Sequence, residues 1–148
     1  MPLPLESIDF DLDFVQWSNC QAQFLREKRW TDLDLEHLIQ EVQDLGKSER
    51  NAITSQLTRV LLHLLKWQYQ PQKRSDSWLD SISDGRFQIE LKIEDSPSLQ
   101  SYPQVVIDRA YTRARKEAAQ QTGLALSIFP AQCPYTLSQI LASQWLPN

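Results

Sequence analysis

Glycine is scarce in this sequence, with three residues in 148, at positions 46, 85 and 123. No two of them are close enough to form a loop that wraps a phosphate group, so the sequence contains no glycine-rich nucleotide-binding motif. A GxSxG motif, the usual nucleophile turn of a serine hydrolase, is also missing. The sequence therefore offers no motif for either chemistry.

Cysteine and histidine are equally few. The two cysteines, Cys20 and Cys133, form neither a disulfide framework nor the CxxC pair typical of a zinc site, which favours a reducing, cytoplasmic setting. Cys133 lies between Gln132 and Pro134 with no neighbouring cation to lower its pKa, so it is not a strong candidate nucleophile. We expect no cofactor.

Long apolar runs are missing too. No stretch approaches the roughly 20 apolar residues that span a bilayer, and the start, MPLPLESIDFDLDF, has carboxylates where a secretory signal has cations. We therefore expect a soluble protein that does not contact membranes. Its length predicts one compact domain over residues 1–148, which includes a short flexible N-terminus of about residues 1–10.

Positive and negative charges are unevenly distributed along the sequence. Acids outnumber bases 19 to 15 overall, yet residues 50–75 carry five cations and no carboxylate. The same segment contains LLHLLKWQY, the most apolar stretch of the chain. Such a segment is either a central helix with one charged face or part of an anion-binding surface. The net charge of −4 argues against a general nucleic-acid binder.

Helical periodicity dominates the first half of the chain. Residues 13–28 form a first amphipathic segment with Asp11 or Asp13 as its N-cap, and Thr31 or Asp34 caps a second. The second segment, about 34–70, repeats apolar residues at spacings of three and four and is stopped by a proline. Gly46 lies within it, so we expect a long central helix that is kinked or broken there. Its apolar positions are Leu35, Leu38, Ile39, Val42, Leu45, Ile53, Leu57, Val60, Leu61, Leu64 and Leu65.

The stretch at 78–93 is ambiguous by periodicity. Residues 87–93 alternate as in a strand, whereas Trp78, Ile82 and Ile89 fit a helix. Because no second run offers a partner strand, we predict a helix. Further helices are expected from Pro103 to Gln121 and after Thr136. The fold class is all-α, with five to six helices around the central one.

Cations and aromatic residues alternate around the end of the central helix. Such a set can bind a ligand or partner, because aromatic rings stack on bases and arginine pairs with phosphate. The same residues also fit a structural corner, in which the rings are buried and the cations pack on them. The candidates are Arg59, His63, Lys66, Trp67, Tyr69, Lys73, Arg74 and Trp78.

One weak metal-ligand pattern is present. Asp34, His37 and Glu41 share a helix face, as a carboxylate–imidazole site requires. No matching ligand pair occurs on another segment, and we expect a polar helix surface rather than a metal centre.

Several motifs, in order, resemble those of one protein family. They are DLDLEHLIQEVQDLGKSER, LLHLLKWQYQP, DSPSL, FPAQCPYTLSQIL and a closing LP. Together they are similar to the bacterial family catalogued as domain of unknown function number 29, over about residues 17–147. The resemblance implies that 78–93 is helical, and it supplies no activity. The family tends to have an amide at position 37, and His37 departs from that pattern.

We therefore expect a non-enzymatic protein-interaction module of the bacterial cytoplasm that binds a protein partner or itself. The alternative is an anion-binding or nucleic-acid-binding protein that uses the basic and aromatic residues between 59 and 78. A metal-dependent enzyme is a third, weaker reading.

Overall fold

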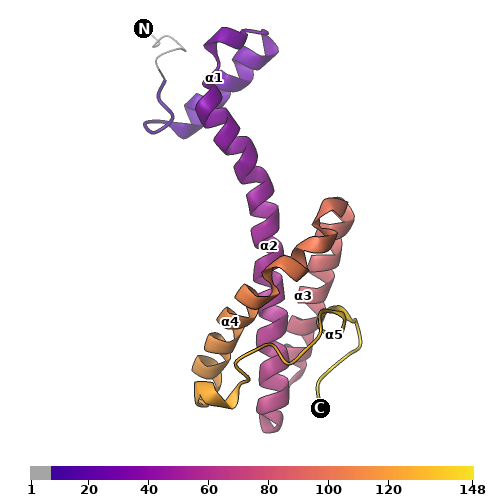
Figure 1. The fold of residues 1–148 in the computed structure, drawn as a ribbon. Helices are drawn as coiled ribbons and strands as arrows, with labels where there is room; N and C mark the ends of the chain where they lie inside the picture. The colour runs from indigo at the N-terminus through magenta and orange to yellow at the C-terminus, as the bar shows by residue number, and fades with distance from the viewer. Residues whose placement is uncertain (1–7) are drawn as a thin grey trace. The chain divides into compact units, whose positions relative to one another are not determined.

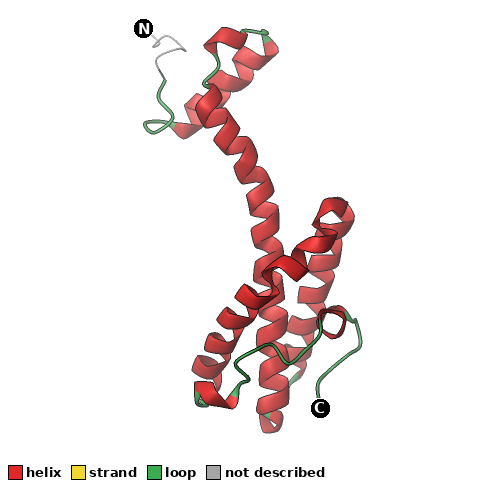
Figure 2. Cartoon of the chain, viewed as in Figure 1, coloured by secondary structure: helices red, strands yellow, loops and turns green. Residues whose placement is uncertain are grey.

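In the computed structural model, the described residues, 8–148, form five α-helices and four short 3-10 helices, with no β-strand among them. The predicted all-α class is confirmed, and Figure 2 shows the helical content. These residues cluster into two compact units, one ending at Lys47 and the other beginning at Ser48. We describe each unit by itself.

The first unit contains α1, Phe14–Arg26, and the start of α2. The side chain of Asp13 caps α1 by accepting a hydrogen bond from the backbone N–H of Gln16, at 3.0 Å. Lys28 then takes a left-handed conformation, with φ of 58°, before the 3-10 helix η2, Trp30–Asp32. The buried side chains of α1 are Trp17, Cys20, Gln21 and Phe24.

Helix α2 runs from Leu35 to Tyr69 as one continuous helix of 35 residues. Gly46 is part of it and does not adopt the positive φ of a C-terminal cap. The alternative in which a helix ends at Gly46 and a new one starts after it is therefore wrong. Pro71 follows directly after the end of α2, where a helix cannot accommodate it without losing a hydrogen bond.

The second unit packs α3, Asp76–Asp95, and α4, Tyr102–Thr122, on either side of the C-terminal part of α2 (Figure 1). The 3-10 helices η3, Pro71–Lys73, and η4, Pro97–Ser101, connect these helices. Helix α3 includes residues 78–93, so the predicted helix there is confirmed and the strand alternative is wrong. Gly85 permits a close approach, because a Cβ at this position would lie 2.6 Å from Cγ2 of Val60 on α2.

The core of the second unit is built on α2. Its residues Ile53, Leu57, Val60, Leu61, Leu64 and Leu65 are all fully buried. Helix α4 contributes Ala110, Ala114 and Ala118, whose small side chains allow a neighbouring helix to approach. Gly123, in the left-handed region at φ 75°, ends α4.

The C-terminal segment covers this core. It contains η5, Leu126–Ile128, and α5, Leu137–Leu141, which begins with a capping box of Thr136 and Gln139. The buried guanidinium group of Arg86 fixes the segment by donating hydrogen bonds to the backbone carbonyls of Gln139, Ile140 and Trp145, at 3.3, 2.7 and 2.8 Å. One side chain thus ties two carbonyls near the end of α5 and a third carbonyl of the segment that follows it.

Of the ten residues predicted to form a flexible N-terminus, residues 1–7 lie outside the described part. Phe10 stacks on His37, with ring centroids 4.2 Å apart, and meets Trp17 edge to face at 4.9 Å. The division of the chain into one domain remains a prediction.

Candidate functional site

The predicted basic and aromatic residues meet in two cation–ring pairs at the end of α2. The ammonium nitrogen of Lys66 lies 4.7 Å from the ring centroid of Trp78, and the guanidinium carbon of Arg74 lies 4.7 Å from that of Trp67. Arg74 also donates a hydrogen bond from Nε to the carbonyl oxygen of Trp67, at 2.9 Å. This geometry matches the structural corner described above, in which the cations pack on the rings.

Lys66 and Arg59 of this set also have polar partners within the second unit. Lys66 donates a hydrogen bond to the side-chain oxygen of Gln121, at 3.0 Å, and burial lowers the pKa of its ammonium group. Arg59 pairs with Asp84 of α3, with Nη1 and Oδ2 2.6 Å apart. One cation on the basic face of α2 therefore forms an ion pair with an acidic residue of α3.

His63 is half-buried on the same helix. Its Nδ1 lies 2.8 Å from the carbonyl oxygen of Arg59 and must carry a proton, because a carbonyl only accepts hydrogen bonds. Burial lowers the pKa of His63, and the positive charges of Lys66 and Arg59 lower it further. The imidazole is thus held neutral as a hydrogen-bond donor to its own helix. Among the remaining candidates, Tyr69 packs edge to face on Phe129, and Lys73 is exposed.

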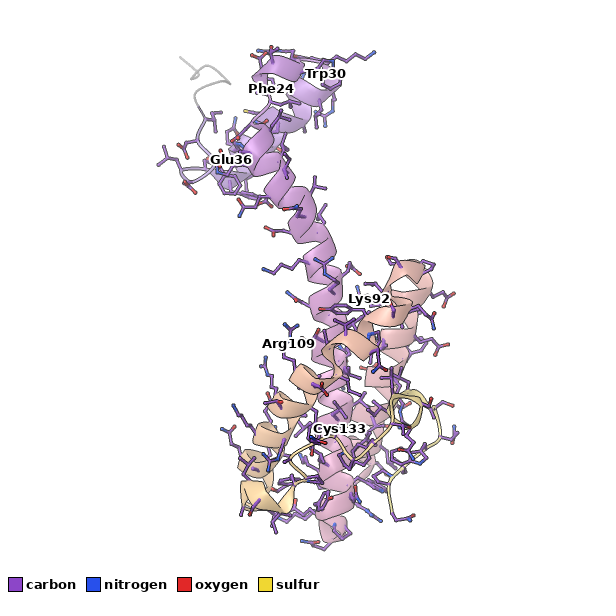
Figure 3. The ribbon with its side chains drawn as sticks, viewed as in Figure 1. Phe24, Trp30, Glu36, Lys92, Arg109 and Cys133 are labelled. Carbon is purple, nitrogen blue, oxygen red and sulfur yellow. The ribbon has the colours of Figure 1, made fainter. Side chains whose placement is uncertain are left out.

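A groove between α2 and α4 brings together a different set of cations. It encloses about 610 Å³, and its charged lining comprises Arg59, Arg109, Arg113 and Glu117. Arg113 pairs with Glu117 at 3.0 Å, whereas Arg109 has no hydrogen-bond or ion-pair partner within the described part of the chain. Figure 3 labels Arg109 on α4. The polar lining of the groove is completed by Asn51, Thr54, Ser55 and Thr58.

Arg109 and Arg113 are not among the site candidates suggested by the sequence, and nothing in the sequence linked them to Arg59. Only the i, i+4, i+8 spacing of Arg109, Arg113 and Glu117 could have indicated that they share one row along a helix. Which helix faces that row is decided by tertiary packing.

The first unit carries an exposed apolar surface. On α2, the exposed fractions of Leu35, Ile39, Val42 and Leu45 are 58, 57, 64 and 71%. At about 100° per residue they lie on an arc of roughly 120°, which defines an apolar stripe along one side of the helix. We call these four residues the α2 stripe. Large contiguous apolar patches on a protein surface often mark interaction sites.

A cluster of rings and polar groups fixes the start of α2. Trp17 donates from Nε1 to Oδ2 of Asp34 at 3.0 Å, and the backbone N–H of Asp34 donates to the side-chain oxygen of Gln21 at 2.8 Å. Oδ2 of Asp34 also lies 2.7 Å from Nδ1 of His37. Burial acts to raise the pKa of Asp34, but the hydrogen bonds from His37 and Trp17 outweigh it and the net shift is downward. Asp34 thus holds α1 against α2 as a carboxylate.

The weak metal candidates are not assembled as a ligand set. Asp34 and His37 bind each other, and Glu41 does not join them. Within residues 8–148 no three histidine, cysteine or acidic side chains are grouped so that they could hold one ion. The candidate site of Asp34, His37 and Glu41 is therefore not supported by the structure.

The thiol of Cys133 is half-buried and donates a hydrogen bond to the carbonyl oxygen of Tyr135, with sulfur and oxygen 3.5 Å apart. Burial raises its pKa above the ordinary value. A thiol in this state stays protonated near neutral pH and is a poor nucleophile, in keeping with the expectation from its sequence neighbours.

These features describe an all-helical protein built on one long helix, with an exposed apolar stripe on its first half and a buried core on its second. The chain belongs to the family described as "Domain of unknown function DUF29", whose model matches residues 10–146. The family predicted from the ordered motifs is thereby confirmed. Neither the curated proteins nor the solved structures include a match to the chain. Within residues 8–148, no helix has the length and apolar character needed to cross a bilayer.

Proposed function

We propose that this chain is a non-enzymatic protein-interaction module that docks an α-helix of its partner on the α2 stripe. The observation that carries the proposal is the exposure of Leu35, Ile39, Val42 and Leu45 on one side of a regular helix. A stripe at i, i+4, i+7 and i+10 has the spacing with which one amphipathic helix recognises another.

The composition of the first unit supports the same proposal. The first unit has a small core. Its helix α1 buries four side chains, Trp17, Cys20, Gln21 and Phe24, whereas the main apolar core of the protein is formed by residues between 57 and 140. A segment of about 40 residues rarely gains enough stability from its own core, and such segments usually acquire it from a disulfide, a metal or a partner. Docking of a partner helix would supply the missing apolar contacts.

Site-specific photo-crosslinking in cells tests this proposal. A benzoylphenylalanine residue is placed at position 39 or 42 of the full chain, and matched controls carry it at Gln40 or Asp44, which lie on the opposite side of the helix. We expect protein adducts from positions 39 and 42 and not from 40 and 44. Adducts of equal yield from all four positions, or from none, would contradict the proposal.

A second candidate function is binding of an anion in the groove between α2 and α4. It is supported by the convergence of Arg59, Arg109 and Arg113 from two helices, with Arg109 lacking an ion-pair partner in the described part of the chain. Arginine binds phosphate and carboxylate groups through paired N–H donors. This groove shares only Arg59 with the residues that the sequence suggested for the same chemistry.

Titration with inorganic phosphate and with a short single-stranded oligonucleotide, followed by NMR, tests the second candidate. We expect shifts of groove resonances that weaken as salt rises and that disappear in Arg109→Gln. Lys116→Gln is the matched control, because Lys116 is an exposed cation of the same helix that does not line the groove. Equal loss of binding in both variants would indicate nonspecific attraction and remove this candidate.

A further inference from the structure

The edges of the α2 stripe are acidic. Residues 34–44 contain four carboxylates, Asp34, Glu36, Glu41 and Asp44, and no lysine or arginine. At about 100° per residue, Glu36 lies beyond Ile39 on one edge of the stripe, and Asp34 and Glu41 lie beyond Leu45 on the other edge. Figure 3 labels Glu36 on α2. Between residues 34 and 45 the apolar stripe is thus bordered by carboxylates on both sides, and the first cation beyond it is Lys47.

Two of these carboxylates form no hydrogen bond or ion pair within the described residues. Asp34 accepts hydrogen bonds from Trp17 and lies against His37, but neither Glu36 nor Glu41 has a hydrogen-bond or ion-pair partner among residues 8–148. Carboxylates without internal partners at the rim of an apolar surface steer a partner of opposite charge and exclude partners of like charge.

A second copy of this chain is a poor occupant of the stripe, because its own stripe is bordered by the same negative charges. In an antiparallel pair with Leu35 opposite Leu45, Glu41 lies opposite Ile39 of the other copy and two positions from its Glu41, so the two Glu41 side chains lie at nearly the same height on the same edge. In a parallel pair, each carboxylate lies at the same height as its own counterpart. Both arrangements place like charges beside the apolar contact, which costs free energy.

We infer that the occupant of the α2 stripe is an amphipathic α-helix of another protein, with leucine-type residues on its contact face and lysine or arginine along both edges of that face. The inference rests on the proposed docking function and names the chemistry of the partner. The stripe from Leu35 to Leu45 is about 15 Å long at 1.5 Å per residue, so a partner helix of about ten to twelve residues covers it.

A displayed library of helical peptides tests this inference. The probes are 14-residue peptides with fixed leucine positions at heptad spacing and with lysine, glutamine or glutamate randomised at the flanking positions. They are selected on the immobilised full chain and counter-selected on Val42→Asp. We expect lysine to be enriched at the flanking positions, and we expect the enriched peptides not to bind Val42→Asp.

The enriched peptide is then measured by fluorescence anisotropy. Glu36→Gln combined with Glu41→Gln is expected to weaken binding by about threefold to tenfold and to reduce its salt dependence, because each rim charge contributes modestly. Asp44→Asn is the matched control, since Asp44 points away from the stripe, and it should change binding by less than about twofold.

The outcomes separate this inference from the docking function. If glutamine or glutamate is enriched, or if binding does not depend on charge, the inference of a basic partner is wrong. The proposal that a helix docks on the stripe is then unaffected. No enrichment, together with a dimer in sedimentation that Val42→Asp dissociates, shows that a second copy is the occupant and overturns the inference. No enrichment with a monomeric chain removes both the inference and the docking function.

Discussion

The two halves of α2 have similar apolar patterns and opposite environments. Leu35, Ile39, Val42 and Leu45 repeat at helical spacing in the first half and are more than half exposed, whereas Ile53, Leu57, Leu61 and Leu64 repeat in the same way in the second half and are fully buried. The difference lies in the neighbours, since α3, α4 and the C-terminal segment cover the second half. An amphipathic pattern therefore identifies which side of a helix is apolar, and packing decides whether that side is covered.

The two halves also differ in how their polar groups are used. In the first unit, Asp34 binds Trp17 and His37, and other carboxylates of α2 have no partner in the described chain. In the second unit, Arg59, Lys92 and Arg86 each bind a group on another element. The polar groups of the second unit link its elements, whereas the α2 part of the first unit retains exposed apolar side chains and carboxylates without an ion-pair partner in the described chain.

The largest expected contrast comes from truncating one leucine or valine in each half. Leu61→Ala removes buried methyl groups from the core and should lower the free energy of unfolding by about 2–5 kcal/mol. Val42→Ala alters an exposed side chain and should change it by less than about 0.5 kcal/mol. Urea denaturation followed by circular dichroism measures both. A large cost for Val42→Ala would mean that the stripe is covered in solution.

A second contrast uses the polar anchors. Arg86→Met leaves three backbone carbonyls of the C-terminal segment without their donor and should cost about 3 kcal/mol. Asp34→Ala removes the cap of α2 and the acceptor of the buried Trp17 N–H, and should cost about 1–3 kcal/mol. Amide hydrogen exchange locates the effects: Arg86→Met should speed exchange in residues 139–148, and Asp34→Ala should do so near residues 34–38. Uniform acceleration in both variants would contradict the assignment of these anchors.

A third contrast comes from two helical glycines, Gly85 in a packed helix and Gly46 in an exposed one. Substitution by alanine should change the stability in opposite directions at the two positions. Gly85→Ala places a Cβ 2.6 Å from Cγ2 of Val60 and should destabilise the second unit by about 1–3 kcal/mol. Gly46→Ala, in the exposed part of α2, should stabilise the helix by about 0.5–1 kcal/mol. Thermal unfolding of the two variants distinguishes the signs. A stabilising Gly85→Ala would show that α3 does not approach α2 this closely.

The two histidines give the smallest and most local contrast. The hydrogen bond with Asp34 raises the pKa of His37 above its ordinary value of 6.5, against the effect of burial, whereas burial lowers that of His63 below 6.5. The contribution of His37 to stability is therefore full below about pH 6.5 and is lost as pH rises through its folded pKa. The contribution of His63 to stability is full above about pH 6.5 and is lost as pH falls through the pKa of His63 in the folded state.

NMR titration of the imidazole Cε1–H resonances measures both histidines in one sample. We expect His37 to titrate at higher pH than His63, and we expect Asp34→Asn to lower the midpoint of His37 while leaving that of His63 unchanged. Coincident midpoints would contradict the different environments of the two imidazoles.

Much of the local structure was predictable because its causes are local. Asp13 and Ser75 cap helices by accepting bonds from residues three positions away, and the capping box of Thr136 and Gln139 spans the same distance. Gly123 ends α4 because it readily adopts the left-handed conformation. The helix at 78–93 was harder to predict, because its alternating apolar residues also fit a strand. The lack of a partner strand elsewhere in the sequence led to the correct prediction of a helix.

The candidate sites were less predictable because they depend on contacts between distant residues. Arg86 binds carbonyls more than 50 positions away, and no sequence pattern linked it to the C-terminal segment. Likewise, Arg109 and Arg113 line a groove with Arg59 only because α4 packs against α2. The predicted cation and aromatic residues did meet, but as pairs of Lys66 with Trp78 and Arg74 with Trp67.

By itself, the sequence determined the helices, their caps and the apolar side of each, since these follow from hydrogen bonds and side-chain spacing within a few residues. It also determined the family, through the order of its motifs. Tertiary structure decided which apolar side is covered and which cations share a groove. The physical reason is that burial and electrostatic pairing depend on groups far apart in the chain, whose meeting is set by the packing of whole helices.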